Sequence, residues 1–214
     1  MADPPFDLLT RMTRLVSDFV EDADSCGITL LYRGAPITVA YSSEVAALND
    51  ELQYTADAGP CLQAMKSQTL VECPDFAGEA RWGGYPAAAL GCGMRSVLSL
   101  PMDAAEAGHA ALNLYSRTVR GFDEHARQSA LQFADVTASI VASARVAAAP
   151  GTAGQWRDGL ARRTAVAQAV GILMARQGCG REAAFELLVR AGREHGEDIH
   201  TAAIRIGSTV GRGA

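Results

Sequence analysis

The hydrophobic residues near the start of the chain recur every three or four positions. Over residues 6–23 they are Leu8, Leu9, Met12, Leu15, Val16, Phe19 and Val20. Side chains at this spacing share one face of an α-helix. The pattern therefore predicts an amphipathic helix whose apolar face packs on the rest of its domain.

Short apolar runs alternate with turn residues through the next hundred positions. Strands are predicted on both sides of 33–36, where Gly34 and Pro36 interrupt the apolar run. Pro60 follows Gly59 and suits the first turn of a helix. The other predicted elements are a helix at 44–53, a strand at 69–73, a helix at 81–93, and a hairpin made of 94–102 and 108–117.

A long helix is predicted from 122 to 146. Its apolar residues form a broad stripe that comprises Leu131, Phe133, Ala134, Val136, Ala138, Ile140 and Val141. We expect this helix and the one at 6–23 to pack on one face of an antiparallel sheet. The order of helix, strands, helices, strands and helix predicts an α+β fold.

Small residues, Pro150 and two glycines give 147–154 the composition of a linker. We therefore divide the chain into a domain with terminal helices at 1–148, a linker at 149–154 and a small all-α domain at 155–214.

Three helices are predicted in this second domain, at 155–177, at 181–194 and from 199 onward. Gly178–Gly180 ends the first helix, and Asp198 is a candidate N-cap for the third. The predicted core of the first helix comprises Leu160, Val166, Ala169, Val170, Ile172, Leu173 and Met174.

Gly171 lies in the most apolar part of that first helix. A glycine inside a helix costs about 1 kcal/mol relative to alanine, so a compensating role is expected. The alanines around it favour a seam where another helix approaches closely. Direct contact with a nucleic-acid backbone is the alternative.

The charge of the chain is divided unevenly between the two predicted domains. Residues 1–154 carry ten Lys or Arg against eighteen Asp or Glu, whereas residues 155–214 carry nine Arg against six acids. The second domain is therefore the one expected to meet a polyanion.

The cysteines and histidines show no spacing typical of a metal site or a disulfide framework. The five cysteines, Cys26, Cys61, Cys73, Cys92 and Cys179, are predicted to be buried reduced thiols. A redox-active pair among Cys61, Cys73 and Cys92 is the alternative. Neither a P-loop nor a nucleophile-elbow sequence is present, so we predict no catalysis, no metal and no cofactor.

The N-terminal residues lack the basic and apolar regions of a secretory signal. The longest apolar stretch, 165–175, is much shorter than the roughly 20 residues that span a bilayer. We therefore expect a cytoplasmic protein that does not cross a membrane.

The segment QAVGILMARQGCGREAAFELLVRA, residues 168–191, resembles the ANTAR domain, a three-helix RNA-binding module of bacterial transcription antiterminators. The resemblance covers about 160–206. The matching positions are Arg163, Ala169, Gly171, Ile172, Leu173, Met174, Cys179, Ala184, Phe185, Leu188, Arg190 and Ala191.

The sequence departs from the usual ANTAR pattern in three places. Val170 stands where a lysine is usual, and Gly192 where a serine is usual. Gly196, Glu197 and Asp198 replace a polar, basic stretch before the third helix. Because phosphate contacts supply much of the affinity for RNA, these changes are expected to weaken binding and flatten its salt dependence.

Upstream, the segments GPCLQA, RWGGY, GMRSVLSLPM, ALNLYS and FDEHARQSALQFAD resemble, in order and spacing, a GAF sensor domain. The resemblance implies a GAF-like antiparallel sheet flanked by helices, followed by the small three-helix bundle. It also implies a pocket for an unidentified small molecule. The aromatic and cysteine candidates for that pocket are Tyr54, Trp82, Tyr85 and Cys92, with burial in the core as the alternative.

Together the two resemblances imply a signal-responsive regulator that acts by transcription antitermination. Such a protein binds stem-loops in the leader of a nascent mRNA as a homodimer. The candidate RNA-binding residues are Arg162, Arg163, Gln168, Arg176, Arg190 and Arg193, because arginine suits phosphate and stacks on loop bases.

Two other functions remain open from the sequence. One is a GAF-fold thiol enzyme of the free methionine sulfoxide reductase type, which would not need the second domain. The other is a DNA-binding regulator that uses the turn at Gly178–Gly180 in helix-turn-helix fashion.

Overall fold

The computed structural model describes residues 4–32, 34–103, 109–146 and 153–209. The chain divides into two compact units, Met1–Trp156 and Arg157–Ala214, which we call the sensor unit and the helical unit. The predicted linker at 149–154 lies mostly outside the described residues, since only 153 and 154 belong to a described helix.

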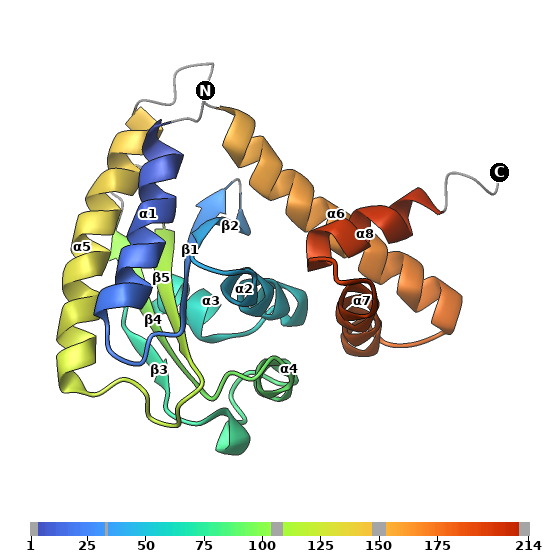
Figure 1. Ribbon diagram of the computed structural model, residues 1–214, viewed down its shortest axis with the longest axis horizontal. Coiled ribbons are helices and arrows are strands. Elements are labelled where there is room, and N and C mark those ends of the chain that lie inside the picture. Colours follow the sequence, from blue (N-terminus) through green and yellow to red (C-terminus); the bar gives the residue numbers. More distant parts are fainter. Residues whose placement is uncertain (1–3, 33, 104–108, 147–152, 210–214) are drawn as a thin grey trace. The chain divides into compact units, whose positions relative to one another are not determined.

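The sensor unit is built on a five-stranded antiparallel sheet with the order β2-β1-β5-β4-β3 (Figure 1). Its strands are β1 (Ser25–Tyr32), β2 (Ala35–Tyr41), β3 (Val71–Cys73), β4 (Ser96–Asp103) and β5 (His109–Ser116). The register pairs Ser99 with Asn113 and Gly27 with Asn113. The predicted strands and the α+β fold class are confirmed.

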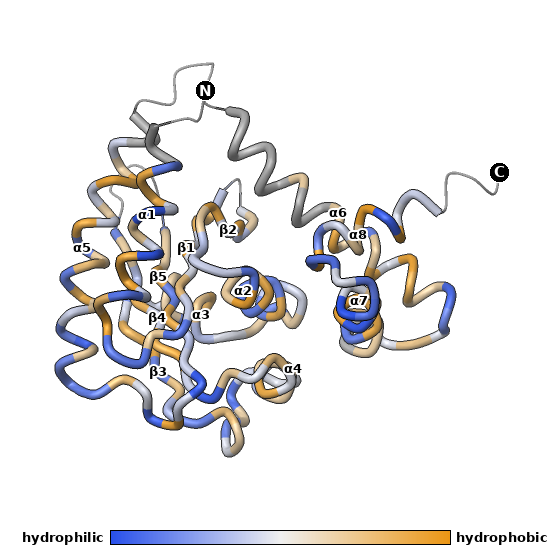
Figure 2. The backbone as a smooth tube through the Cα atoms, viewed as in Figure 1, coloured by the Kyte–Doolittle hydropathy of each residue, from blue (hydrophilic) through white to orange (hydrophobic). Residues whose placement is uncertain are grey.

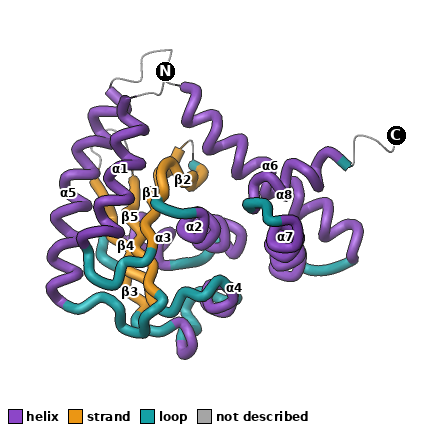
Figure 3. The backbone as a smooth tube through the Cα atoms, viewed as in Figure 1, coloured by secondary structure: helices purple, strands orange, loops and turns teal. Residues whose placement is uncertain are grey.

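Helices cover both faces of this sheet (Figure 3). The helices α1 (Pro4–Phe19) and α5 (Glu124–Val146) contact each other and lie against β1 and β4. The helices α2 (Glu44–Ala56), α3 (Pro60–Ser67) and α4 (Tyr85–Gly91) belong to the other side, together with the short 3-10 turn η1 (Phe76–Gly78). The prediction that the first and last helices of this domain share one face is confirmed.

The two faces of the sheet differ in chemistry, because alternate residues of a strand point to opposite sides. The face toward α1 and α5 is apolar and carries Ile28, Leu30, Leu98, Leu100, Leu112 and Leu114, all buried. Figure 2 shows that hydrophobic residues recur along the strands. The face toward α2 and α3 carries small or polar residues, among them Gly27, Thr29, Ser99, Asn113 and Tyr115.

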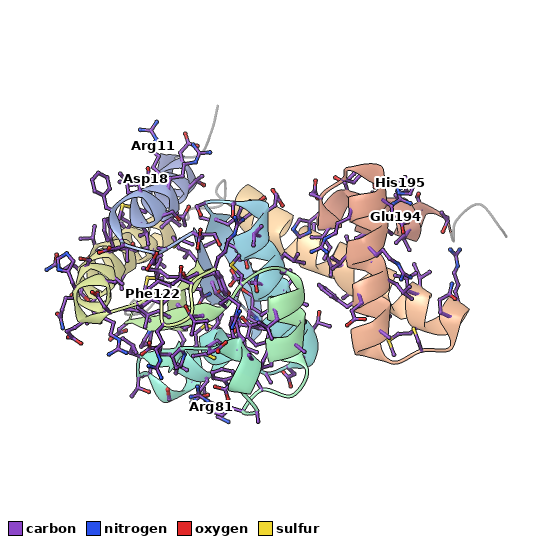
Figure 4. All side chains as sticks on the ribbon, turned by 60° about the horizontal axis from the view of Figure 1, so that its bottom comes forward. Arg11, Asp18, Arg81, Phe122, Glu194 and His195 are labelled. Carbon is purple, nitrogen blue, oxygen red and sulfur yellow. The ribbon has the colours of Figure 1, made fainter. Side chains whose placement is uncertain are left out.

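The buried stripe of α5 differs from the prediction. Leu131 and Val136 are exposed, by 38% and 54%, whereas the buried positions are Ala126, Ala130, Ala134, Thr137 and Val141. Small side chains at this seam let the helix lie close to the sheet and to α1. Leu8, Leu15 and Phe19 of α1 are exposed too, and Figure 4 shows Arg11 and Asp18 on the outward side of that helix.

The helices of the helical unit are α6 (Ala153–Gln177), whose first four residues belong to the sensor unit, α7 (Arg181–His195) and α8 (Ile199–Ser208). Its described core comprises Val166, Ala169 and Val170 of α6, Ala184, Phe185 and Leu188 of α7, and Ile199, Ala202, Ala203 and Ile206 of α8. The three predicted helices are therefore confirmed. Leu160, predicted as core, has its side chain outside the described residues.

Candidate functional site

The central part of α6 presents an exposed surface without charge. Ala167, Gln168, Gly171, Met174 and Ala175 are exposed, and their spacing places them on one side of the helix. We call these five residues the α6 lane. Val170, at the position where ANTAR domains usually carry lysine, lies on the buried side instead.

Gly171 and Met174 correct two sequence predictions. Apart from its chain neighbours and the backbone of its own helix, no described atom lies within 4 Å of where a Cβ on Gly171 would be, so the described part of the chain gives no close helix packing there. Met174 is 36% exposed and Ile172 and Leu173 are half-buried, so these three do not form the centre of the core. The buried core of the helical unit includes Phe185, Ala202 and Ile206 instead.

The cations of the helical unit are distributed unequally among its helices. By sequence α6 has four arginines against one aspartate, a net charge of +3, whereas the three arginines of α7 face three glutamates. Arg176 and Gln168 are exposed on α6. Arg162 and Arg163 also fall on α6, at positions whose side chains are outside the described residues.

The two candidate arginines of α7, Arg190 and Arg193, are exposed. The guanidinium Nε of Arg190 lies 3.9 Å from an Oε1 of Glu194, four residues along the same helix. Figure 4 shows Glu194 and His195 at the end of α7. An exposed ion pair of this kind contributes little to stability, so Arg190 remains able to contact an anion.

The acidic residues before α8 have structural roles. Asp198 caps the helix, since its Oδ1 accepts hydrogen bonds from the backbone N–H groups of His200 (2.8 Å) and Thr201 (2.9 Å). Glu197 accepts a hydrogen bond of 2.9 Å from Nε of Arg205. The predicted N-cap is thus confirmed, and Arg205 balances the charge of Glu197.

Gly192 marks a close approach between α7 and the turn that precedes α8. A Cβ at this position would lie 3.0 Å from the backbone oxygen of Glu197, which is tighter than an ordinary contact. The backbone N–H of Glu197 donates a 2.9 Å hydrogen bond to the carbonyl of Gly192. Glycine here therefore permits this tight turn.

The four predicted pocket residues lie in the sensor unit on the α2–α4 side. Tyr54, Trp82 and Tyr85 are buried and Cys92 is half-buried. Trp82 donates a hydrogen bond to Oε1 of Gln63 (2.9 Å), and the guanidinium of Arg81 stacks on its ring at 4.2 Å. Phe76 packs edge-on against Tyr85 with ring centroids 5.6 Å apart. Trp82 and Tyr85 are thus packed against other side chains, and that the four residues line a pocket stays a prediction.

The thiols of Cys61 and Cys73 are poor nucleophiles. Cys26, Cys61 and Cys73 are buried, and all five cysteines are free. Burial raises the pKa of Cys61 and that of Cys73 to about 12. Because the thiolate is the reactive form, neither is ready to attack a substrate at neutral pH.

A carboxylate that the sequence analysis missed lies at the centre of the polar face. Asp50 of α2 is fully buried. Its Oδ1 accepts hydrogen bonds from the hydroxyl of Tyr115 (2.5 Å) and from Nδ2 of Asn113 (2.9 Å). Its Oδ2 accepts one of 3.0 Å from the hydroxyl of Thr38. The only signal in the sequence was an alternation of small and polar residues on β1 and β5.

Gly27 of β1 leaves no room beside this carboxylate. A Cβ on Gly27 would lie 2.5 Å from Oδ2 of Asp50 and 3.3 Å from its Cγ. Three hydrogen bonds hold Asp50 in place, so Gly27→Ala is expected to destabilise the sensor unit by about 1–3 kcal/mol. Urea unfolding measures the change.

Gly91→Ala is the matched control, since no described atom lies within 4 Å of a Cβ at that position. Equal stability of the two variants would contradict the tight contact between Gly27 and Asp50.

Within the described residues, no three His, Cys, Asp or Glu side chains gather as a metal site would require. No described helix is both long and apolar enough to cross a bilayer.

Comparison with known proteins identifies both units. A family model of the GAF domain matches residues 4–142, and a model of the ANTAR domain matches residues 154–206. No curated protein matches the chain.

Solved structures of low sequence identity share the fold of the sensor unit. One is the GAF domain region of a putative membrane protein from Geobacter sulfurreducens PCA, with 18% identity, a TM-score of 0.52, and coverage of 64% of this chain and 93% of that one. Another is the GAF domain of a phosphoenolpyruvate-protein phosphotransferase from Coxiella burnetii, with 14% identity, a TM-score of 0.53, and coverage of 68% and 87%.

A third similar structure is a type II free methionine-R-sulfoxide reductase from Thermoplasma acidophilum, with 15% identity, a TM-score of 0.50, and coverage of 64% and 92%. At these identities the likeness concerns the fold alone. The family models, by contrast, cover both units and more than half of the chain. The chain belongs to the GAF domain family, and its GAF–ANTAR architecture is that of a signal-responsive regulator with an RNA-binding domain rather than that of an enzyme.

Proposed function

We propose that this protein regulates transcription by antitermination, binding stem-loops in the leader of a nascent mRNA in the cytoplasm. In this proposal the protein acts as a homodimer, and the sensor unit responds to a signal. The observation that carries the proposal is the combination on α6 of a +3 net charge with an exposed, uncharged lane, inside the segment that matches the ANTAR domain.

The chemistry of α6 suits RNA better than that of α7 or α8. Its arginines supply long-range attraction to phosphates. Three of the five residues of the α6 lane, Ala167, Gly171 and Ala175, are small, so that an RNA backbone or an unpaired base can approach the helix closely there. The amide of Gln168 lies in the same lane and is suited to hydrogen bonding with a base edge.

The DNA-binding alternative is disfavoured by the charges of α7 and α8. The α7 arginines are matched by an equal number of glutamates. On α8, Arg205 binds Glu197 and the carbonyl of Ala191, so it is not presented to a major groove. A recognition helix commonly reads base edges with amide as well as cationic side chains, and the sequences of α7 and α8 contain no asparagine or glutamine.

The thiol-enzyme alternative rests on the fold shared with the Thermoplasma acidophilum reductase. The buried, un-ionised thiols of Cys61 and Cys73 count against it. Turnover of free methionine sulfoxide by the full chain would restore this alternative.

A direct test of the proposed function is in vitro transcription through a terminator. The template places tandem stem-loops so that the second overlaps the terminator hairpin. The full chain is expected to increase read-through on this template, and to leave read-through unchanged when the loop sequences are scrambled. Absence of any effect on the first template would overturn the proposal.

Gly171→Ala tests the role of the α6 lane separately from folding. The substitution is expected to stabilise the helical unit by up to about 1 kcal/mol, because alanine is the better helix former and the site has space. The added methyl group lies on the lane, so the affinity for stem-loop RNA is expected to fall. Thermal unfolding and a gel-shift assay measure the two effects.

Gly207→Ala on α8 is the control, since it too is a helical glycine with no described atom within 4 Å of a Cβ. It is expected to keep the RNA affinity of the unchanged protein. If Gly171→Ala binds RNA equally well, the lane does not face RNA.

A further inference from the structure

The sensor unit buries an acidic group without a cation. Asp50 has no exposed surface, and none of the ion pairs among the described residues includes it. Burying an unpaired charge is costly, so such a group either receives strong hydrogen bonds or becomes neutral. The surroundings of Asp50 allow both states.

A chain of hydroxyl groups begins at Asp50. The hydroxyl of Thr38 lies 3.0 Å from Oδ2 of Asp50 and 2.9 Å from the hydroxyl of Tyr54. The Tyr54 hydroxyl lies in turn 2.7 Å from that of Thr29. Asn113 closes the circuit, since its Nδ2 donates to Thr29 (3.1 Å) and to Oδ1 of Asp50 (2.9 Å). The chain thus joins α2 to β1, β2 and β5.

The direction of the hydrogen bonds in this chain depends on whether Asp50 carries a proton. When Asp50 is ionised, Thr38 donates to it, Tyr54 donates to Thr38, and Thr29 donates to Tyr54. When Oδ2 carries a proton, that proton points at Thr38, which must then donate toward Tyr54. A hydroxyl both donates and accepts, so the links among Asp50, Thr38, Tyr54 and Thr29 can reverse without moving a heavy atom, whereas Nδ2 of Asn113 donates in both states.

A second set of contacts connects the same carboxylate to α3. The Tyr115 hydroxyl that donates to Asp50 accepts a 2.8 Å hydrogen bond from Nε2 of Gln53. The Oε1 of Gln53 accepts a 2.8 Å hydrogen bond from the backbone N–H of Cys61, in the first turn of α3. Hydrogen bonds therefore connect Asp50 of α2 both to the sheet and, through Tyr115 and Gln53, to the first turn of α3.

We propose that Asp50 is a proton-binding switch of the sensor unit, whose protonation reverses the hydroxyl links through Thr38, Tyr54 and Thr29 that join α2 to the sheet. The proposal concerns the sensor unit alone and does not depend on RNA binding.

The pKa values of Asp50 and of the titratable groups around it agree with the proposal that Asp50 binds the proton. Burial raises the pKa of Asp50 to about 7, and the hydrogen bonds from Tyr115, Thr38 and Asn113 oppose the rise. The other titratable groups that interact with Asp50 come from β1, α2, α3, α4 and β5. They are Cys26, Tyr54, Cys61, Tyr85 and Tyr115, and burial raises the pKa of each, so all five remain neutral when Asp50 titrates. Glu51, the next residue of α2, is the nearest further carboxyl group in the sequence.

Infrared spectroscopy of the full chain tests the proposal, because a protonated carboxyl group has its own carbonyl-stretch band. In the unchanged protein we expect such a band to titrate with a midpoint near pH 7. Asp50→Asn is expected to lack it. Asp57→Asn, an exposed position one residue beyond α2, is the control and is expected to keep it.

Thr38→Val provides a test that does not require the Asp50 variant to fold. It removes one donor to the carboxylate, so the midpoint is expected to rise by about one pH unit. The proposal is overturned if no carboxyl group titrates near neutral pH, if the band persists in Asp50→Asn, or if the midpoint is the same in Thr38→Val.

Discussion

Simultaneous replacement of Arg163 and Arg190 by alanine is expected to abolish stem-loop binding by the full chain in a low-salt gel-shift assay. Both arginines occupy positions of the ANTAR pattern. Each phosphate contact that is lost reduces the slope of log affinity against log salt by about 0.7–0.9, so removing two should lower both the affinity and the slope. Arg163→Ala alone is expected to cost more than Arg190→Ala, because Arg163 belongs to the positively charged α6 and Arg190 has Glu194 beside it.

The matched control removes two exposed arginines from the sensor unit. Arg11→Ala combined with Arg14→Ala on α1 changes the net charge by the same amount. If this control weakens RNA binding as much as the replacement of Arg163 and Arg190 does, the loss of affinity comes from the change in the net charge of the protein. The assignment of α6 as the RNA-facing helix would then be wrong.

The free energy of unfolding of the sensor unit is expected to fall as the pH rises from about 4 to 7. Burial raises the pKa of Asp50 from 3.8 to about 7. In that range the folded state therefore holds a proton that the unfolded state has released, and folding is favoured most at the acidic end. Over these roughly three pH units the free energy of unfolding falls by about 4 kcal/mol. It falls no further above the pKa that Asp50 has in the folded state.

Asp50→Asn is expected to remove most of this pH dependence, because asparagine resembles the protonated carboxyl group. Urea unfolding at pH 5 and pH 8, followed by the fluorescence of buried Trp82 in a Trp156→Phe background, measures the difference. The hydrogen bond from Arg81 lowers the pKa of Glu79 to about 2. Glu79 therefore changes the free energy of unfolding only below about pH 5, outside the range that is compared. If the free energy of unfolding changes equally with pH in the unchanged protein and in Asp50→Asn, the role given to Asp50 is wrong.

The elements of both units could be predicted from the sequence because their signals are local. Period-two and period-3.6 patterns, Pro60 at a helix start and Asp198 as an N-cap each act within a few residues. Which apolar residues are buried could not be predicted so well. On α5, Leu131 and Val136 are more hydrophobic than Ala126 and yet exposed, since helix contact with a sheet favours small residues at the seam.

The candidate site, too, was predicted from the sequence only in part. The resemblance to the ANTAR domain indicated α6 and its arginines. The exposure of Gly171 and Met174 could not be predicted, because periodicity does not show which part of an apolar helix finds a partner. Asp50 was missed for a related reason. Its burial depends on hydroxyl and amide groups of β2 and β5 that meet α2 only in the folded structure.

The central claim, that the helical unit gives the protein a specific affinity for structured RNA, is tested most directly by a salt series. The full chain is titrated with a tandem stem-loop RNA carrying hexanucleotide loops and with an unpaired RNA of the same composition. We expect tighter binding to the stem-loop RNA at every salt concentration, together with an affinity that falls as salt rises. Equal affinity for both RNAs, or a slope near zero, would contradict it.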